Sequence, residues 1–578
     1  MIGLVLIKLW LVGGQRLTPY GLLTIDDRWF VARAAEIRAG HWLGPFDGYT
    51  LIKQPGYPLF IAAAQALHVP LLLAEQLLYA FAAGMVVLAS RSLLRGAHRR
   101  TAAFAIMLFN PMTMNVIVSA RVDRSGVFPA LTLLLLACLV GAIDNEMQSS
   151  WQTLAWSTGA ALSLGGLWAV REEWLLLVPA VAIAMTWAAV RAIRSHGAGR
   201  FAGTTRSRGL GIVSVLIIPL PGMLGSAWLG YANDHRYGVA VTNLEQGSMS
   251  DALGAMFRVR SSPAFDRFPA TAESRQQMYG VSPTLVSLEG ELERGVGQRF
   301  ASTRPDGRTD LGGGVFQWAV LDAIHAIGRD TDASEVDGVF RSIANEIDAA
   351  CADGRLRCGA AGTGIAPAWN WSRLPALAAR TIAGLGRTIN LGQFSAIPAP
   401  GNGTDADRSL FAKMTREPLT PGSAPSPGLA PSPGLAQPQG STSSPGSTVS
   451  AEPLAYPGPL TSVGRLDRFR IHSISGLRWM YRLLTVAALV MFVRRAQACW
   501  RDQRRPAVAA LALGCLGGLL AGVRLAGLAY LDLSLFPAFN PPYVASAYAV
   551  ILAVSAAVTV GGGDQAEPVS SPQTSEST

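Results

Sequence analysis

Two adjacent carboxylates, Asp26 and Asp27, follow the first apolar segment of the chain. Neighbouring carboxylates repel each other and are costly to bury in hydrocarbon, so they must face water, a counter-charge or a substrate. Lys53 follows in the same loop, and further loops between apolar segments carry Arg121, Asp123, Arg124, Arg171, Glu172 and Glu173. A carboxylate can take a proton from an attacking hydroxyl, and fixed cations can stabilise a departing lipid phosphate. An ion pair that ends a helix is enough to explain any one of these charged residues taken alone. The whole set, taken together, favours a functional site.

The composition indicates a membrane protein. Of 578 residues, 50% are hydrophobic and only 15% are charged, whereas a soluble domain has roughly 25% charged residues. The apolar residues form runs near the length of a bilayer crossing. The predicted spans are 1–14, 70–93, 101–118, 126–143, 152–169, 174–193, 210–230, 477–493, 506–530 and 541–561. We therefore expect a mainly α-helical polytopic protein with about ten spans.

The distribution of Lys and Arg predicts the orientation. The connections richest in these residues are 94–100, 191–208 and 494–505, and basic loops stay in the cytoplasm. The net charge of +10 is then a topology signal, and it gives no reason to expect nucleic acid as a partner. Asp26, Asp27 and the long segment 231–476 fall outside. Arginines in the short outer turns 119–125 and 170–173 run against the positive-inside tendency, so another role should explain them.

The pattern along the chain predicts its division into parts. The parts are an N-terminal membrane domain 1–230 with an outer loop 15–69, an inserted periplasmic α-rich domain 231–395, a disordered Pro/Ser/Gly-rich linker 396–475, C-terminal spans 476–562, and a disordered tail 563–578. Within the outer loop, 27–42 and 56–68 are expected to be interfacial helices.

The cysteines and histidines give no sign of a metal centre. Cys351 and Cys358 flank a turn in the inserted domain, and a disulfide is favoured there because no histidine or second cysteine pair completes a ligand set. The seven histidines form no HExxH-like pair. No metal and no cofactor are expected.

Several outer segments together resemble a known family. "IDDRWFVARAAEIRAGHW" followed by "YTLIKQPGYPLFIAAA" is similar to the first outer loop of membrane glycosyltransferases with the GT-C fold, such as protein O-mannosyltransferases and the aminoarabinose transferases that modify lipid A. "LFNPMTMNVIVSARVDRSGVFPALTLLLLA", "LWAVREEWLLLVPA" and "FPAFNPPYVASAYAVILA" look like later outer turns of that family. The resemblance covers about 1–230 and 480–562, whereas the insert 231–476 departs from the pattern.

The resemblance implies roles for individual residues. Asp26 matches the family's catalytic carboxylate, which acts as a base on the acceptor. Asp27 stands where many relatives have Glu, and we expect it to be the second catalytic carboxylate, which orients the base or the sugar. Lys53 matches a cation near the donor phosphate. We expect Arg121, Arg124 and Arg171 to contact the same phosphate. Four further residues are expected to bind or orient the substrate: Tyr57, Asp123, Glu172 and Glu173.

The implied function is an inverting transfer of a sugar from a polyprenyl-phosphate donor to a glycan, lipid or protein acceptor of the cell envelope. The chain would lie in the bacterial inner membrane, with its active site and insert facing the periplasm. Two alternatives remain. A transporter or flippase would place its charges near the bilayer midplane rather than at span ends. A non-catalytic envelope assembly protein would not require Asp26 and Lys53.

Overall fold

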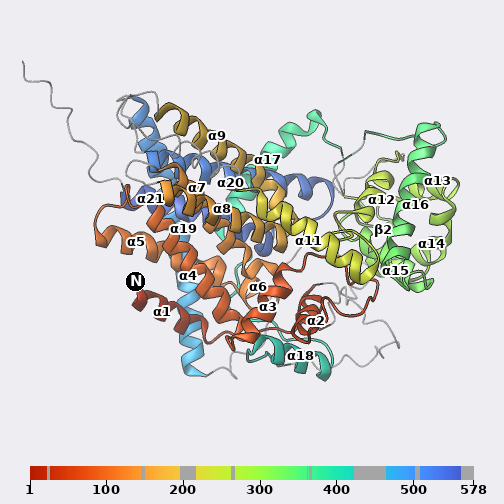
Figure 1. Cartoon of the computed structure of the whole chain (residues 1–578), viewed down its shortest axis with the longest axis horizontal. Helices are drawn as coiled ribbons and strands as arrows, with labels where there is room; N and C mark the ends of the chain where they lie inside the picture. Colours follow the sequence, from red (N-terminus) through yellow and green to blue (C-terminus); the bar gives the residue numbers. More distant parts are fainter. Residues whose placement is uncertain are drawn as a thin grey trace, which may run out of the picture.

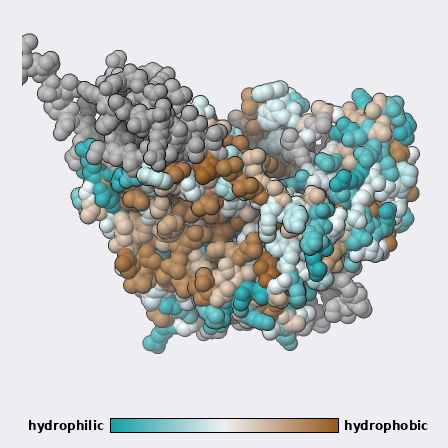
Figure 2. Space-filling view, in the orientation of Figure 1, coloured by the Kyte–Doolittle hydropathy of each residue, from teal (hydrophilic) through white to brown (hydrophobic). Residues whose placement is uncertain are grey.

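The structure is a computed structural model of the whole chain, and it is mainly helical. It describes residues 1–21, 26–144, 150–195, 217–261, 267–360, 362, 368–421, 464–501 and 508–561. Figure 1 shows two parts, a bundle of long helices and a cluster of shorter helices beside it. Figure 2 shows apolar residues gathered over the bundle and polar residues over the smaller part. The mainly helical fold predicted from the sequence is confirmed.

Five helices in the described ranges are long and apolar enough to cross a membrane. They are α4 (Leu71–Ala89), α7 (Phe128–Ile143), α19 (Arg465–Arg501), α20 (Val508–Ser534) and α21 (Pro541–Gly561). The other predicted spans correspond to helices that are shorter or less apolar, namely α1 (Ile2–Val12), α5 (Ala97–Leu108), α8 (Ser150–Val170), α9 (Val178–Ser195) and α11 (Leu220–Tyr237). The chain is thus a multi-pass membrane protein, and the count of ten spans stays a prediction.

The expected continuous span over 101–118 is wrong. Helix α5 stops at Leu108, and the chain continues as η1 (Pro111–Met114) and α6 (Val116–Ser119). Pro111 lacks a backbone N–H and disfavours a helical conformation at Asn110. The Asn110 side chain instead accepts a hydrogen bond from the Met112 N–H at 2.9 Å. This break leads the chain into the turn that carries Arg121 and Asp123.

Helix α7 forms the centre of the bundle because it is apolar all round and nearly every side chain on it is buried. Helices α4, α8, α20 and α21 pack around it. The contact with α8 is close. A Cβ at Gly141 would lie 2.4 Å from the Trp156 ring, so only glycine fits there.

The smaller part has a core of its own. It contains α12 (Ser248–Phe257), α13 (Ala272–Tyr279), α14 (Pro283–Glu293), η4 (Val296–Phe300), the antiparallel pair β1 (Ala301–Thr303) and β2 (Thr309–Leu311), α15 (Phe316–Ala326) and α16 (Ala333–Ala352). Val320 and Ile324 of α15 are four residues apart, which is a helical spacing, and both are buried in this core. Ile343 of α16 is buried in the same core. Asp332 caps α16 by accepting from the Glu335 N–H at 2.9 Å. The structure joins Cys351 to Cys358 in a disulfide.

The chain then returns to the membrane part through η5 (Trp371–Arg373) and α17 (Leu374–Asn390), which packs against α20. Next, α18 (Asp405–Thr415) packs against α2 (Asp27–Arg38) and α3 (Gly56–Ala66). The helices α2 and α3 stand where the sequence predicts helices.

The prediction of a disordered linker over 396–475 is wrong at both ends. Thr404 and Asp407 form a capping box at the start of α18, and Phe411 is completely buried. Asp407 also pairs with Arg28 of α2 at 2.9 Å. These local and long-range contacts order a segment whose composition alone indicates a linker. Helix α19 begins already at Arg465. Residues 422–463 and the predicted tail 563–578 lie outside the described residues.

Candidate functional site

Asp26 is the accessible member of the acid pair. It stands at the N-cap position of α2, but its side chain makes no capping hydrogen bond there. It forms an ion pair with the Lys53 ammonium instead, and its side chain is 39% exposed. Lys53 is only 4% exposed. A partly exposed carboxylate therefore pairs with an almost completely buried cation.

Two aromatic rings from different parts of the protein hold Lys53. Its Nζ atom lies 5.4 Å from the centre of the Phe30 ring in α2 and 5.6 Å from that of the Trp318 ring in α15. The loop before α15 packs closely on the membrane part, because the Gly314 N–H donates to the Leu535 carbonyl at 3.2 Å. The inserted part thus contributes directly to the site.

Asp27 faces inward, in contrast to Asp26. It is completely buried, and Arg121 binds both of its oxygens, with the Nε–Oδ1 distance at 3.2 Å. Burial raises the pKa of Asp27 to about 6, although Arg121 acts in the opposite direction. Asp27 therefore fixes Arg121 and does not face an open site.

Asp123 connects several of the predicted arginines. Its Oδ1 accepts from the Ser125 N–H at 2.8 Å and so caps η2 (Arg124–Gly126). Burial opposes ionisation, but Arg171 and Arg121 hold the pKa of Asp123 well below its usual range. Asp123 is therefore a fixed negative charge between two guanidinium groups.

The remaining predicted arginines are also paired with carboxylates. Arg124 bonds both oxygens of Glu172 at 2.7 Å. Arg171 pairs with Glu173 at 2.8 Å, in η3 (Glu172–Leu177). It also donates to the Pro542 carbonyl at 3.1 Å, so the start of α21 reaches the site. Contact of these arginines with a donor phosphate stays a prediction.

Two residues of the site, Arg524 and Glu245, were not predicted from the sequence. Arg524 lies inside the apolar run of α20, is 1% exposed, and donates to the Tyr543 carbonyl at 3.2 Å. Glu245 lies between α11 and α12, where the Gln317 amide approaches it at 3.4 Å. The intramembrane position of Arg524 was a usable signal. Glu245 gave none, because it is one acid in a long insert.

The surroundings of Glu245 place it in the site. Burial, followed by the charge of Glu172, raises its pKa to about 8, whereas Lys53 and Arg124 act to lower it. These surroundings favour the protonated form of Glu245, which can donate a hydrogen bond. The site then contains five cationic side chains, Lys53, Arg121, Arg124, Arg171 and Arg524. It also contains five further carboxyl groups, Asp26, Asp27, Asp123, Glu172 and Glu173, four of which form ion pairs with these cations. These residues with Glu245 are called the span-end cluster below.

The expectation that Tyr57 orients a substrate is not supported. Its ring is completely buried and packs edge-on against Phe30, with the ring centres 5.2 Å apart. Its hydroxyl donates to Glu75 at 2.8 Å. Because the phenol is buried and its hydroxyl is already hydrogen-bonded to Glu75, Tyr57 has a packing role in the interior of the protein. Within the ranges that the structure describes, no group of three His, Cys, Asp or Glu side chains is arranged to hold a metal ion.

Comparisons with known proteins give two structural matches. No family model and no curated relative matches the chain. The crystal structures of ArnT from Cupriavidus metallidurans, in the apo state and bound to undecaprenyl phosphate, match with 13% identity and TM-scores of 0.30 and 0.29. The matches cover 97% of this chain and 76% and 77% of those chains. They agree with the resemblance noted in the sequence, but at these TM-scores we base no functional argument on them.

Proposed function

We propose that the protein is an inverting membrane glycosyltransferase that moves a sugar from a polyprenyl-phosphate donor to an acceptor of the cell envelope. The observation that carries this proposal is the pairing of the half-exposed Asp26 with the nearly buried Lys53, beside the charges of the span-end cluster. A base and a phosphate-binding cation next to each other, at the level where membrane helices end, suit a reaction on a lipid-linked substrate.

In the proposed reaction, the acceptor oxygen attacks the anomeric carbon while the bond from that carbon to the phosphate oxygen breaks. Asp26 takes the proton from the acceptor hydroxyl. The sugar phosphodiester carries one negative charge, and the departing polyprenyl phosphate gains a second. Lys53 stabilises the developing charge, since its low exposure strengthens the interaction. A single displacement inverts the configuration at the anomeric carbon.

Donor binding would also change the state of Asp26. Without the donor, the Asp26 carboxylate is engaged in the ion pair with the Lys53 ammonium. A donor phosphate that takes over Lys53 releases Asp26 from this counter-charge. The carboxylate would thus be free to approach the acceptor hydroxyl only when the donor is present, which limits wasteful activation of water.

The proposed location is the bacterial inner membrane, with the span-end cluster and inserted part on the periplasmic side. The direct test uses protein purified into lipid nanodiscs and a panel of polyprenyl-phosphate sugars. Release of polyprenyl phosphate, dependent on an acceptor fraction, supports the proposal. Movement of intact donor between leaflets without cleavage would contradict it and indicate a flippase.

A further inference from the structure

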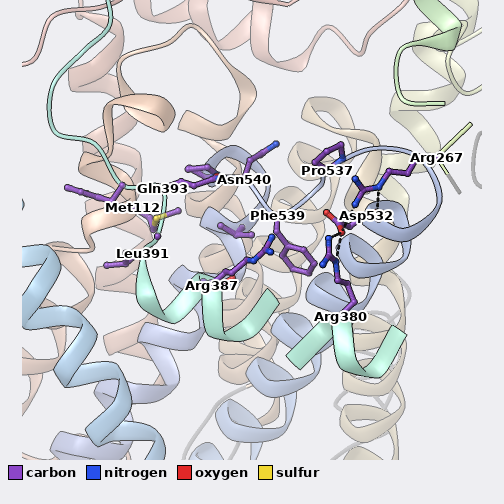
Figure 3. A pocket seen from close by; sticks show the side chains of 15 residues that line it. Met112, Arg267, Arg380, Arg387, Leu391, Gln393, Asp532, Pro537, Phe539 and Asn540 are labelled. Atoms are coloured by element: carbon purple, nitrogen blue, oxygen red, sulfur yellow. Dashed lines mark hydrogen bonds and ion pairs between the residues drawn. The ribbon is translucent and has the colours of Figure 1, made fainter. Parts of the chain in front are cut away.

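A cavity of about 470 Å³ is lined by residues outside the span-end cluster. It is enclosed by the end of α20, the start of α21, helix α17 and η1 (Figure 3). Its volume lies in the range of small-molecule sites. The site already described does not use it, and its lining residues differ from those of the cluster.

The cavity carries excess positive charge. Its charged lining residues are Arg267, Arg380, Arg387 and Asp532, which leave a net formal charge of +2. The buried Asp532 accepts from Arg267 at 3.2 Å, pairs with Arg380, and accepts from the Ala538 N–H at 3.0 Å. Arg387 is exposed, and its guanidinium has no ion-pair or hydrogen-bond partner among the described residues. One full guanidinium is therefore left for an external anion.

Another polar group in the cavity also lacks a partner. The Oδ1 atom of Asn540 is buried and accepts no hydrogen bond from any described residue. Asn540 lines the same cavity as Arg387. An unsatisfied buried oxygen is costly, so a ligand or water with a hydroxyl group would stabilise it.

Part of the cavity lining is apolar. This part includes Met112, Leu391, Phe394 and Val544. Figure 3 shows Arg267, Asp532 and Arg380 at one end and Met112 and Leu391 at the other, with Arg387 between them. The cavity therefore matches a ligand that has an anionic group next to hydrocarbon.

The position of the cavity fits a membrane amphiphile. It lies between Ser534, where α20 ends, and Pro541, where α21 begins, at the level of span ends. Apolar side chains of the adjoining segment are exposed, with Trp371 at 75% and Ile382 at 70%. Aromatic and aliphatic groups beside arginines are typical of the membrane interface.

We propose that this cavity binds the phosphate of a membrane amphiphile, with Arg387 as the principal contact and the apolar wall holding the start of the chain. The site is distinct from the donor site at Lys53. The two are close, because Pro541 lines the cavity whereas the Pro542 carbonyl bonds Arg171. The proposal concerns binding and does not depend on sugar transfer.

The experiment measures lipid retention by native mass spectrometry. The protein is reconstituted in phosphatidylcholine nanodiscs that contain a small fraction of phosphatidic acid, with and without excess inorganic phosphate. The variants are Arg387→Gln, Arg387→Lys, Asp532→Asn and Lys53→Ala. Arg308→Gln is the matched control, because it removes the same charge from an exposed position between β1 and β2.

We expect phosphatidic acid to be retained in preference to phosphatidylcholine. Arg387→Gln should weaken retention about tenfold, the scale of one partly exposed charge-assisted contact, whereas Arg387→Lys and Arg308→Gln should have little effect. Asp532→Asn removes the competing carboxylate and should strengthen retention, which a purely structural role would not do. The Lys53→Ala variant should still retain phosphatidic acid through Arg387.

Three results would overturn the proposal. The first is no preference for phosphatidic acid over phosphatidylcholine. The second is equal loss in Arg387→Gln and Arg308→Gln, which would show a general charge effect. The third is complete displacement by inorganic phosphate, which would identify free phosphate as the occupant. A failed sugar-transfer assay with intact retention that depends on Arg387 would instead count against the proposed function alone.

Discussion

Replacement of Asp26 by Asn separates catalysis from binding. The substitution keeps the shape of the side chain and removes the proton acceptor, so turnover should fall by about two orders of magnitude or more. The Asn oxygen can still accept from Lys53, and Asp26 is 39% exposed, so the free energy of unfolding should fall by no more than about 1 kcal/mol. Donor affinity should be equal or higher, because Lys53 no longer has a competing carboxylate.

The assay is single-turnover release of polyprenyl phosphate, with donor binding measured separately. Asp47→Asn is the matched control, because Asp47 is 46% exposed and pairs with the buried Arg33 in the same outer loop. It should leave turnover within about twofold. Near-normal turnover in Asp26→Asn, or an equal loss in both variants, would refute the assignment of Asp26 as the base.

Three further predictions follow from the contacts. Lys53→Ala should weaken donor binding by about 1.5–3 kcal/mol, the scale of one charge-assisted contact, measured by titration with donor. Glu245 has a raised pKa in the folded state, so the folded chain binds more protons, and stability should fall as pH rises from about 5 to 8. Glu245→Gln should reduce this slope between about pH 6 and 8, above the pKa of Asp27, measured by thermal unfolding at several pH values; an unchanged slope there would assign it to another group. Phe411→Ala should destabilise the packing of α18 on α2 by about 3–5 kcal/mol, measured as increased protease cleavage near 405–415, and equal cleavage in both proteins would contradict this packing.

The parts of the site that are close in sequence or at span ends could be predicted. Asp26 and Lys53 share one outer loop, and the departure from the positive-inside tendency is enough to single out Arg121 and Arg171. Composition could not show that each arginine already has a carboxylate partner, because partner choice depends on the three-dimensional packing of separate turns. The break at Asn110 was readable from the following proline but was hidden by the apolar run around it.

The contribution of the inserted part could not be predicted. Trp318 contacts Lys53 from a position 265 residues away, and Glu245 interacts with it electrostatically from 192 residues away. A single sequence contains no signal for interactions at such separations. The order in 396–421 was missed for a related reason. Its glycines and prolines indicate a linker, whereas the capping box at Thr404 and the burial of Phe411 against α2 and α3 decide the outcome.

The most direct test of the account is the stereochemistry of the transferred sugar. Wild-type protein, a polyprenyl-phosphate sugar of known anomeric configuration and an acceptor fraction are incubated, and the product linkage is determined by NMR. The account predicts transfer with inversion in the wild type and in Asp47→Asn, and its loss in Asp26→Asn. Transfer with retained configuration, or no release of polyprenyl phosphate from any donor by stable protein, would contradict it.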